Sequence, residues 1–186
     1  ANSKSFHSVM VKMNNSIQNS LFVNCLLESE NGESIYMGGE GFLYKYTPVH
    51  ETWENIIGLE SDNVKSLSKG SDGHILIGTD NGVFDMFNGA MKHYRHDSRQ
   101  ELSLADNEIW CIYADSHSNV WTGHERGFSI ASNSGSIRTI KLSTLTHSGE
   151  GNEIHVIRRD SKNNLWLAGT NGVIKLSDNS APAWYR

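Results

Sequence analysis

The stretch GHILIGTDNGVF, residues 73–84, decides the fold because three near copies of it recur along the chain. Each copy reads as a polar turn, a run of apolar and aromatic residues, a small residue, a second polar turn, a glycine and an apolar stretch. The other copies are ESIYMGGEGFLY (33–44), SNVWTGHERGFS (118–129) and NNLWLAGTNGVI (163–174). Their closing glycines recur every 41 to 45 residues, which predicts a repeat architecture: Gly41, Gly82, Gly127 and Gly172.

Each copy is preceded by a stretch in which apolar and polar residues alternate, the pattern of a half-buried β-strand. DG, NG and NN pairs follow these stretches and supply the positive-φ residues that tight hairpins need. Two further strand-like pieces follow each closing glycine, and no window keeps a helical apolar period beyond about two turns. Four short antiparallel strands in a unit of about 40–45 residues form a β-propeller blade. The sequence therefore predicts an all-β protein, a β-propeller of four repeats of four-stranded antiparallel blades.

The repeat register also predicts the limits of the blades. They are expected at 15–57, 58–100, 101–143 and 144–186, after an outer strand of a preceding blade at 1–14. Both ends then fall inside blades, so we expect a fragment of a larger propeller. Such a fragment can close as four blades, pair with a second copy into a ring of about eight, or stay an open arc. Because bare blade faces are apolar, we expect self-association of propeller segments.

Composition limits the partners. The 186 residues carry a formal net charge of -5, and no basic stripe stands out, so nucleic-acid binding is not expected. No apolar run reaches the roughly 18–20 residues of a membrane span, so a membrane link is expected only through other parts of a parent protein. Cys25 and Cys111 occupy equivalent positions in non-neighbouring blades, too far apart for a disulfide, and are expected to be buried free thiols.

The repeats resemble the two-component regulator propeller repeat, which runs as an apolar strand, an Asp-x-x-Gly/Asn turn, Leu-Trp-Ile-Gly-Thr and then Asn-Gly-Leu. The second repeat matches it at Asp72-Gly73, Ile75–Thr79 and Asn81–Val83. The fourth matches at Asp160, Leu165–Leu167 and Gly169–Val173, with Ala168 interpreted as a local insertion. The third repeat carries His124 in place of the Thr, and the first carries Gly39 there.

The resemblance implies a sensor. In this family, such propellers form the periplasmic region of hybrid two-component histidine kinases, which Bacteroides-type bacteria use to sense oligosaccharides. It therefore implies a periplasmic, ligand-sensing segment that recognises an oligosaccharide and relays a signal to a histidine kinase in the inner membrane. Two other functions stay open: a protein-interaction or dimerisation scaffold, and an enzyme similar to the streptogramin lyases, which carry a related repeat.

Candidate ligand-binding residues come from turns and strand starts that the register places on one face of the propeller. The first strands begin near Asn24, Lys65, Trp110 and His155, at equivalent positions, and the last three of these are the candidates. The turns between second and third strands contribute Asp80, Asn81, His124, Glu125 and Arg126. An aromatic platform beside charged and amide groups suits a sugar, which stacks through its C–H face and hydrogen-bonds through its hydroxyls. The alternative is a set of solvated turn residues with one packing tryptophan. Trp121 and Trp166 are interpreted as packing residues between blades.

No residue is assigned a catalytic role, and neither a metal nor a cofactor is predicted. The nine histidines do not cluster with cysteines or carboxylates at metal-ligand spacing. The chain has no Gly-x-Ser-x-Gly elbow, phosphate-binding loop or HExxH motif. A lyase would need His124, Glu125 and His155 to converge at the mouth of the channel.

Overall fold

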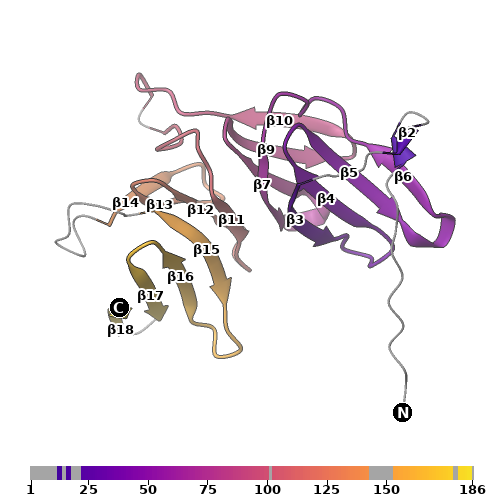
Figure 1. The fold of residues 1–186 in the computed structure, drawn as a ribbon. Coiled ribbons are helices and arrows are strands. Elements are labelled where there is room, and N and C mark those ends of the chain that lie inside the picture. Colours follow the sequence, from indigo (N-terminus) through magenta and orange to yellow (C-terminus); the bar gives the residue numbers. More distant parts are fainter. Residues whose placement is uncertain are drawn as a thin grey trace, which may run out of the picture.

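The computed structural model describes residues 12–13, 16–17, 22–100, 102–142, 153–177 and 180–185. Within these residues the chain forms four four-stranded antiparallel sheets and a short hairpin of β1 (Lys12–Met13) and β2 (Ser16–Ile17) (Figure 1). The helical elements described are two short 3-10 turns, η1 (Pro48–His50) and η2 (Ser71–Gly73). The predicted all-β class and the four blades of a propeller are therefore confirmed.

Each sheet is a meander of four consecutive strands, so neighbours in a sheet are also neighbours in sequence. The first sheet holds β3 (Val23–Glu28), β4 (Ile35–Gly39), β5 (Phe42–Thr47) and β6 (Thr52–Asn55). The second holds β7 (Val64–Lys69), β8 (Ile75–Thr79), β9 (Gly82–Phe87) and β10 (Ala90–Tyr94). The third holds β11 (Cys111–Ala114), β12 (Val120–His124), β13 (Gly127–Ala131) and β14 (Ile137–Lys141). The fourth holds β15 (Ile154–Arg159), β16 (Leu165–Gly169), β17 (Gly172–Ser177) and β18 (Ser180–Tyr185).

One sheet lies within each of the four predicted blade ranges. The residues at which one blade passes into the next stay a prediction, because parts of the connections lie outside the described residues. The outer strand expected at residues 1–14 also lies outside them, apart from β1.

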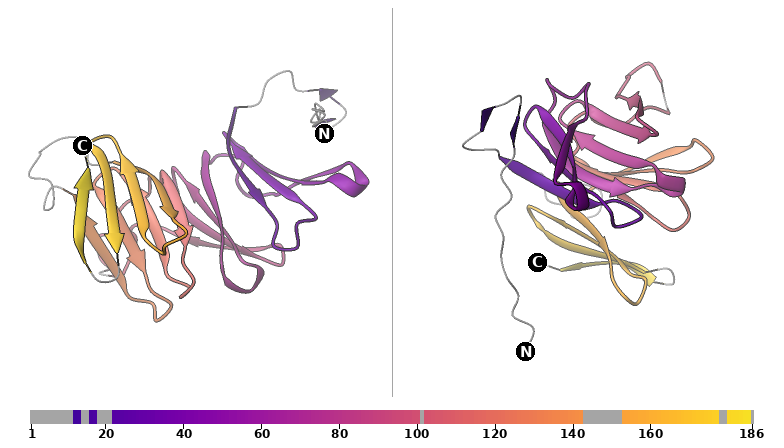
Figure 2. Two further views of the ribbon diagram at one scale, coloured as in Figure 1. Left: turned by 90° about the horizontal axis from the view of Figure 1, so that it is seen from below. Right: turned by 90° about the vertical axis from the view of Figure 1, so that its right-hand side faces the viewer.

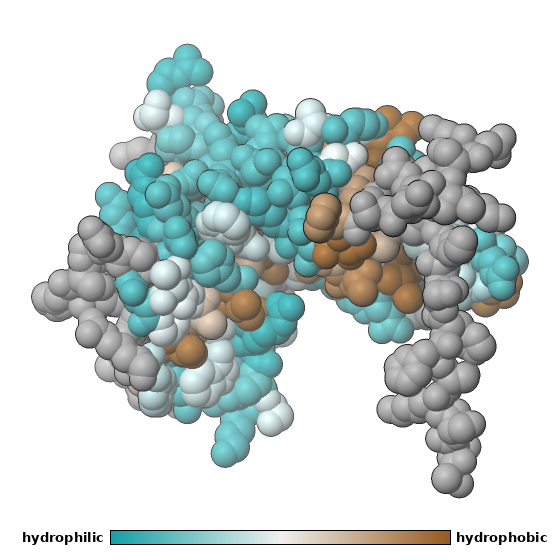
Figure 3. Space-filling view, viewed as in Figure 1, coloured by the Kyte–Doolittle hydropathy of each residue, from teal (hydrophilic) through white to brown (hydrophobic). Residues whose placement is uncertain are grey.

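Successive sheets meet through their first strands: β3 contacts β7, β7 contacts β11, and β11 contacts β15. In Figure 2 the four sheets follow one another in an arc, with the first and the fourth sheet at its two ends. One face of each end sheet therefore lacks a neighbouring blade within the described chain. Apolar side chains are exposed on the first sheet, where Figure 3 shows a hydrophobic patch: Phe22, Val23, Leu26 and Ile35.

Apolar clusters join the sheets because the inner strands of a blade must bury both of their faces. Between the first and second sheets, Tyr36 and Leu43 pack in one cluster with Val64, Ile77 and Phe84. Leu43 and Ile77 are both 0% exposed. The contact surface between these two blades is thus a continuous hydrophobic core.

The third and fourth sheets are joined in the same way, and Trp121 takes part. Its ring packs on Phe128 with 5.9 Å between centroids, in a cluster with Ile157 and Leu167 of the fourth sheet. The predicted packing role of Trp121 is confirmed. Trp166 lies at the equivalent position of the fourth sheet, on the face without a neighbouring blade, so its packing role between blades stays a prediction.

An aspartate organises the hairpin that joins β15 to β16. The carboxylate of Asp160 accepts a hydrogen bond of 2.8 Å from Nε1 of Trp166, three from Asn164 and one from the backbone N–H of Lys162. The bonds from Trp166 and Asn164 lower the pKa of Asp160, because they favour its charged form. The Asp-x-x-x-Asn-x-Trp spacing of the repeat is therefore the spacing of one turn and its hydrogen-bond donors.

The hairpin between β11 and β12 is built in the same way. Asp115 accepts hydrogen bonds from Asn119, from Nε1 of Trp121 and from the backbone N–H of His117. Partial burial alone would raise the pKa of Asp115, but the bonds from Asn119 and Trp121 outweigh it, and the pKa is lowered. Two blades thus share one carboxylate-centred turn.

The strand register corrects one detail of the sequence alignment. Ala168 pairs with Val173, as Gly78 pairs with Val83 in the second sheet. The interpretation of Ala168 as an insertion is therefore wrong: Ala168 replaces Gly78, and Thr170 lies in the turn. The neighbouring small residues allowed two alignments that differ by one residue, and only the pairing of the strands distinguishes them.

Both cysteines are free, as expected, with Cys111 buried and Cys25 half-buried. Burial raises the pKa of each thiol to about 12, so neither is ionised at neutral pH.

We expect Ile77→Ala to lower the free energy of unfolding by about 2–5 kcal/mol, because it leaves a cavity between the first two sheets. Urea unfolding followed by tryptophan fluorescence measures this change. Ile57→Ala removes the same atoms from a side chain that is 75% exposed, and should change stability by less than about 0.5 kcal/mol. Equal effects of the two substitutions would contradict the packing described.

We expect part of the stability at neutral pH to come from Asp160. Its folded-state pKa is lowered from 3.8, so its contribution is present above that value and is lost as the pH falls through the folded pKa. Asp160→Asn should therefore be less stable than the unmodified chain at neutral pH and lose less stability on acidification. Urea unfolding across this pH range tests the expectation, and parallel pH profiles for the two chains would refute it.

Candidate ligand-binding site at the propeller axis

The innermost strands carry a β-bulge near their start, and the extra residue is the one that the sequence places at the axis. The register of β7 skips Lys65, between Val64 and Ser66. The same irregularity leaves Asn24 unpaired in β3 and His155 unpaired in β15. A bulge turns the side chain of its extra residue out of the regular alternation.

Trp110 completes the set. It precedes β11, and its backbone N–H donates to the carbonyl of Gly123 at 2.9 Å. Trp110 lines, together with Asn24, Lys65 and His155, one cavity of about 300 Å³ between the first strands of the four sheets. We call this the axial cavity. The structure thus brings Lys65, Trp110 and His155 together, as their equivalent positions predicted.

Lys65 and Trp110 form the centre of the axial cavity. The Nζ atom of Lys65 lies 3.6 Å from the centroid of the Trp110 ring and 2.6 Å from Oε1 of Glu108. The Lys65 side chain is only 12% exposed, whereas that of Glu108 is 45% exposed. A cation on an aromatic face is stabilised by about 0.5–2 kcal/mol, more when it is shielded from water.

This contact changes the interpretation of Trp110 as an open stacking platform. One face of its ring is already covered by the Lys65 ammonium group. The edge of His155 lies against the same indole, with 5.1 Å between ring centroids and an interplanar angle of 71°. The Nε1 atom of Trp110 is buried and has no hydrogen-bond partner among the described residues. Such an unpaired buried donor is uncommon in folded proteins.

His155 is linked to its own sheet by a second carboxylate. Its Nε2 atom lies 3.3 Å from Oε2 of Glu153, which also accepts a hydrogen bond of 2.7 Å from the Thr170 hydroxyl. Asn24 donates from Nδ2 to Oδ1 of Asn63 at 2.7 Å, across to the second blade.

Three residues of this site were missed at the level of sequence, and they share one position. Asn63, Glu108 and Glu153 each precede an axial residue by two places, and each is a polar partner in the contacts above. They could have been found from the sequence by extending the alignment of the repeats two residues upstream of the axial positions.

Asp80 and Asn81 lie beside the axial cavity and do not line it. Asp80 accepts a hydrogen bond of 2.9 Å from the backbone N–H of Asn63, and Asn81 donates from Nδ2 to Asp62 at 2.7 Å. These bonds tie the turn between β8 and β9 to the segment that enters β7. They hold the segment that leads to Lys65.

His124 is buried inside the third sheet, with 1% of its surface exposed. Its Nδ1 accepts the backbone N–H of Arg126 at 3.3 Å, as the Thr79 hydroxyl accepts that of Asn81. Burial lowers the pKa of His124 to about 4, so the imidazole is neutral. His124 therefore replaces a threonine as the acceptor in a turn and does not reach the axial cavity.

Glu125 and Arg126 are exposed in the turn between β12 and β13, and neither lines the axial cavity. His124 is enclosed in its sheet while His155 faces the axis, so the three groups required for a lyase do not converge there. Within the described ranges there is no cluster of three or more metal-ligating side chains and no helix long and apolar enough to cross a membrane.

The geometry defines a β-propeller with a small polar cavity at its axis, and comparisons with known proteins show what the chain resembles. Residues 103–126, which include Trp110 and Glu108, match the model of the two-component regulator propeller family. No curated protein matches the chain in sequence.

Two solved structures from B. thetaiotaomicron resemble the chain. The extracellular domain of a putative one-component system is 36% identical over 91% of this chain, with a TM-score of 0.58. The extracellular domain of a putative hybrid two-component system is 19% identical over 96%, with a TM-score of 0.75. This chain covers 24% of the length of each. The resemblance to the two-component regulator propeller repeat is thereby confirmed, and the family model matches the repeat unit at residues 103–126.

A virginiamycin B lyase from Staphylococcus aureus has the same fold at lower identity. It is 14% identical over 94% of this chain, which covers 57% of the lyase, with a TM-score of 0.67. Identity at this level shows the shared propeller fold alone.

Proposed function

We propose that the chain is a non-catalytic, ligand-sensing segment of a periplasmic two-component sensor, and that its axial cavity binds one sugar unit of an acidic oligosaccharide. The observation that supports this most is the Lys65 ammonium group, held on Trp110 and paired with the more exposed Glu108. A ligand carboxylate that takes the place of Glu108 would gain a charge-assisted hydrogen bond. The freed Glu108 would return to solvent.

The size and the polar groups of the cavity agree with a single sugar unit. A volume of about 300 Å³ lies at the lower end of the range for small-molecule sites. Asn24, His155 and the unpaired Nε1 of Trp110 offer hydrogen bonds to ring hydroxyls. Arg158 lines the same cavity and adds a second positive charge.

The contacts between blades suggest how binding would be relayed. Lys65 of the second blade lies on Trp110 of the third, and Trp110 lies against His155 of the fourth. A ligand that displaces Lys65 therefore acts on the joint between blades. In the whole protein, that change would pass to a histidine kinase, a partner suggested by the hybrid two-component system among the similar structures.

Calorimetry with neutral and glucuronate-containing trisaccharides tests the axial site. Trp110→Ala and Lys65→Met should each weaken binding of the acidic sugar at least about tenfold, because each removes one side of the stacked pair. Glu108→Gln should strengthen it, because the competing carboxylate is gone. Arg126→Ala is the matched control in the exposed turn and should bind normally. Undiminished affinity in both Trp110→Ala and Lys65→Met would refute the site.

The free faces of the end sheets favour a second function, association between segments. Val23, Leu26 and Ile35 are 43%, 65% and 39% exposed. The residues at the same positions of the second sheet are buried against the first sheet, including Val64 at 0%. The bare face of the first sheet is therefore built like the covered face of a blade.

Charge complementarity supports a second copy of this chain as the occupant of that face. Arg159 of the fourth sheet contacts the Tyr113 hydroxyl of the third sheet at 3.2 Å. By repeat position, Glu28 corresponds to Arg159 and Arg158 corresponds to Tyr113. A head-to-tail pair would thus place Glu28 of one copy beside Arg158 of the other. Neither forms an ion pair within the described part of the chain.

Sedimentation velocity at low ionic strength measures this association. Glu28→Lys and Arg158→Glu should each weaken it, and the double variant should restore it, because the pair is then re-formed with its charges exchanged. Glu125→Lys makes the same charge change away from both free faces and should leave association unchanged. A monomer at all concentrations, or a double variant no better than the single variants, would exclude this arrangement.

A further inference from the structure

The third sheet turns small, hydroxylic side chains toward the second sheet. Thr122 and Ser129 are cross-strand partners on this face. The equivalent partners in the second sheet are Ile77 and Phe84, which are buried against the first sheet. Two large apolar side chains at one blade contact are thus replaced by two small polar ones at the next.

Comparison with the fourth sheet shows that the third sheet is the exception. Its partners at the same position are Leu167 and Ile174, both buried against the third sheet. The neighbouring row repeats the trend, since Ala131 of the third sheet stands where the other two sheets have Met86 and Leu176.

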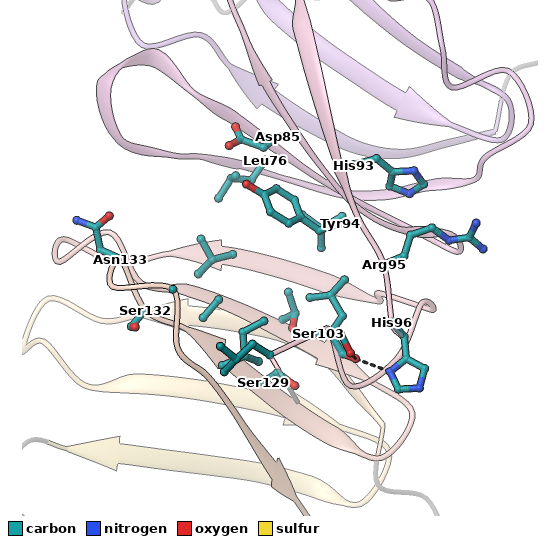
Figure 4. Close-up of a pocket in the computed structure, with 18 of the residues that line it drawn as sticks. Leu76, Asp85, His93, Tyr94, Arg95, His96, Ser103, Ser129, Ser132 and Asn133 are labelled. Carbon is teal, nitrogen blue, oxygen red and sulfur yellow. Dashed lines mark hydrogen bonds between the residues drawn. The ribbon is translucent and has the colours of Figure 1, made fainter. Parts of the chain in front are cut away.

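These small residues leave a cleft of about 990 Å³ between the second and third sheets (Figure 4). Protein interiors are normally packed with few voids. An apolar cluster of Leu76, Val83, Leu104, Ile109 and Ile112 still joins the second and third sheets, and its first three members line the cleft. The linker between β10 and β11 borders the cleft through Arg95, His96 and Leu104. The cleft is a separate place from the axial cavity, with which it shares no lining residue.

The wall of the cleft formed by the third sheet carries two hydroxyl side chains, Thr122 and Ser129, which are 3% and 2% exposed. Ser129 Oγ lies 3.1 Å from Nε2 of His124 and 2.9 Å from the Thr139 hydroxyl. Because Nδ1 of His124 accepts the N–H of Arg126, its Nε2 carries the proton and donates to Ser129. The Thr122 hydroxyl has no hydrogen-bond partner among the described residues.

The wall formed by the second sheet offers a carboxylate and an aromatic ring. Oδ1 of Asp85 lies 2.7 Å from Nδ1 of His74, and the two side chains are 20% and 34% exposed. One hydrogen bond leaves a carboxylate most of its acceptor capacity. Tyr94 is 39% exposed, and Figure 4 shows its hydroxyl end directed toward Asp85 and Leu76.

We propose that this cleft binds a neutral polyhydroxylated molecule of about the size of a trisaccharide. The carboxylate of Asp85 would accept hydrogen bonds from ligand hydroxyls, and the Thr122 hydroxyl would bind another from the opposite wall. Both carboxylates at the cleft already have cationic or imidazole partners, Asp85 with His74 and Asp97 with Arg99. The carboxylates at the cleft are therefore available as hydrogen-bond acceptors and are not free to attract a cation, and the volume suits a small-molecule site.

A ligand in the cleft would also affect the axial cavity. The second and third sheets, which form its walls, supply Lys65 and Trp110 to the axial cavity. A ligand that bridges the two sheets fixes their separation and thereby the contact between those two side chains.

Amide chemical-shift mapping of the full chain with maltotriose, cellotriose and mannitol tests the proposal. At least one probe should cause saturable shifts at Asp85, Thr122 and Ser129. Asp85→Asn should weaken that binding roughly tenfold or more, since a charge-assisted acceptor is lost. Glu125→Gln makes the same carboxylate-to-amide change in an exposed turn that lines neither cavity, and it should leave this binding unchanged.

A graft supplies a second and independent readout. Thr122→Ile combined with Ser129→Phe copies the pair of the second sheet, so it should fill the cleft and abolish the shifts, although it also removes the hydrogen-bond partner of His124 Nε2. If the grafted variant does not fold, the loss of probe binding in Asp85→Asn relative to the unmodified chain tests the proposal instead. Shifts confined to Lys65 and Trp110, or no shift with any of the three probes, would overturn the cleft proposal. The first of these two outcomes would leave the axial site standing.

Discussion

The structure depends on one constraint, that the inner strands of a blade have two apolar faces and one sheet cannot cover both. Side chains such as Ile77 and Leu167 lose all contact with water only because the preceding sheet lies on them. Burial of such a side chain contributes roughly 1.5–3 kcal/mol. Each blade is therefore stabilised by its neighbours, and the residue types on a sheet face indicate whether another sheet covers that face.

Departures from that constraint coincide with the places where we propose function. At the two ends of the arc, a face built for a neighbour is exposed, as Leu26 shows. Between the second and third sheets, Thr122 and Ser129 stand where packing favours larger apolar residues, and a cleft results. At the axis, bulges at Asn24, Lys65 and His155 direct polar side chains into a common cavity. Natural proteins commonly break a local rule where a site requires it.

Much of this architecture could be predicted from sequence because the repeat is periodic and each copy aligns with the others. Equivalent positions predicted that Lys65, Trp110 and His155 meet, without any knowledge of their contacts. His124 shows the limit of this reasoning: its residue type pointed to a site, but its ring replaces the Thr79 hydroxyl as a buried acceptor. The position of Lys65 over Trp110 and the cleft depend on how side chains fill space between sheets, which periodicity does not encode. The alignment at Ala168 failed for a simpler reason, since small neighbouring residues fit two registers.

The central claim is that the axial cavity is a binding site, with Lys65 on Trp110 at its centre. The indole N–H of Trp110 is the most direct reporter, because it is buried and has no partner among the described residues. Its proton resonance should be followed by NMR while a trisaccharide ending in glucuronate is added. The account predicts a saturable shift of this resonance that exceeds the shifts of the Trp53 and Trp121 indoles. A bound trisaccharide that leaves the Trp110 resonance unmoved would contradict it.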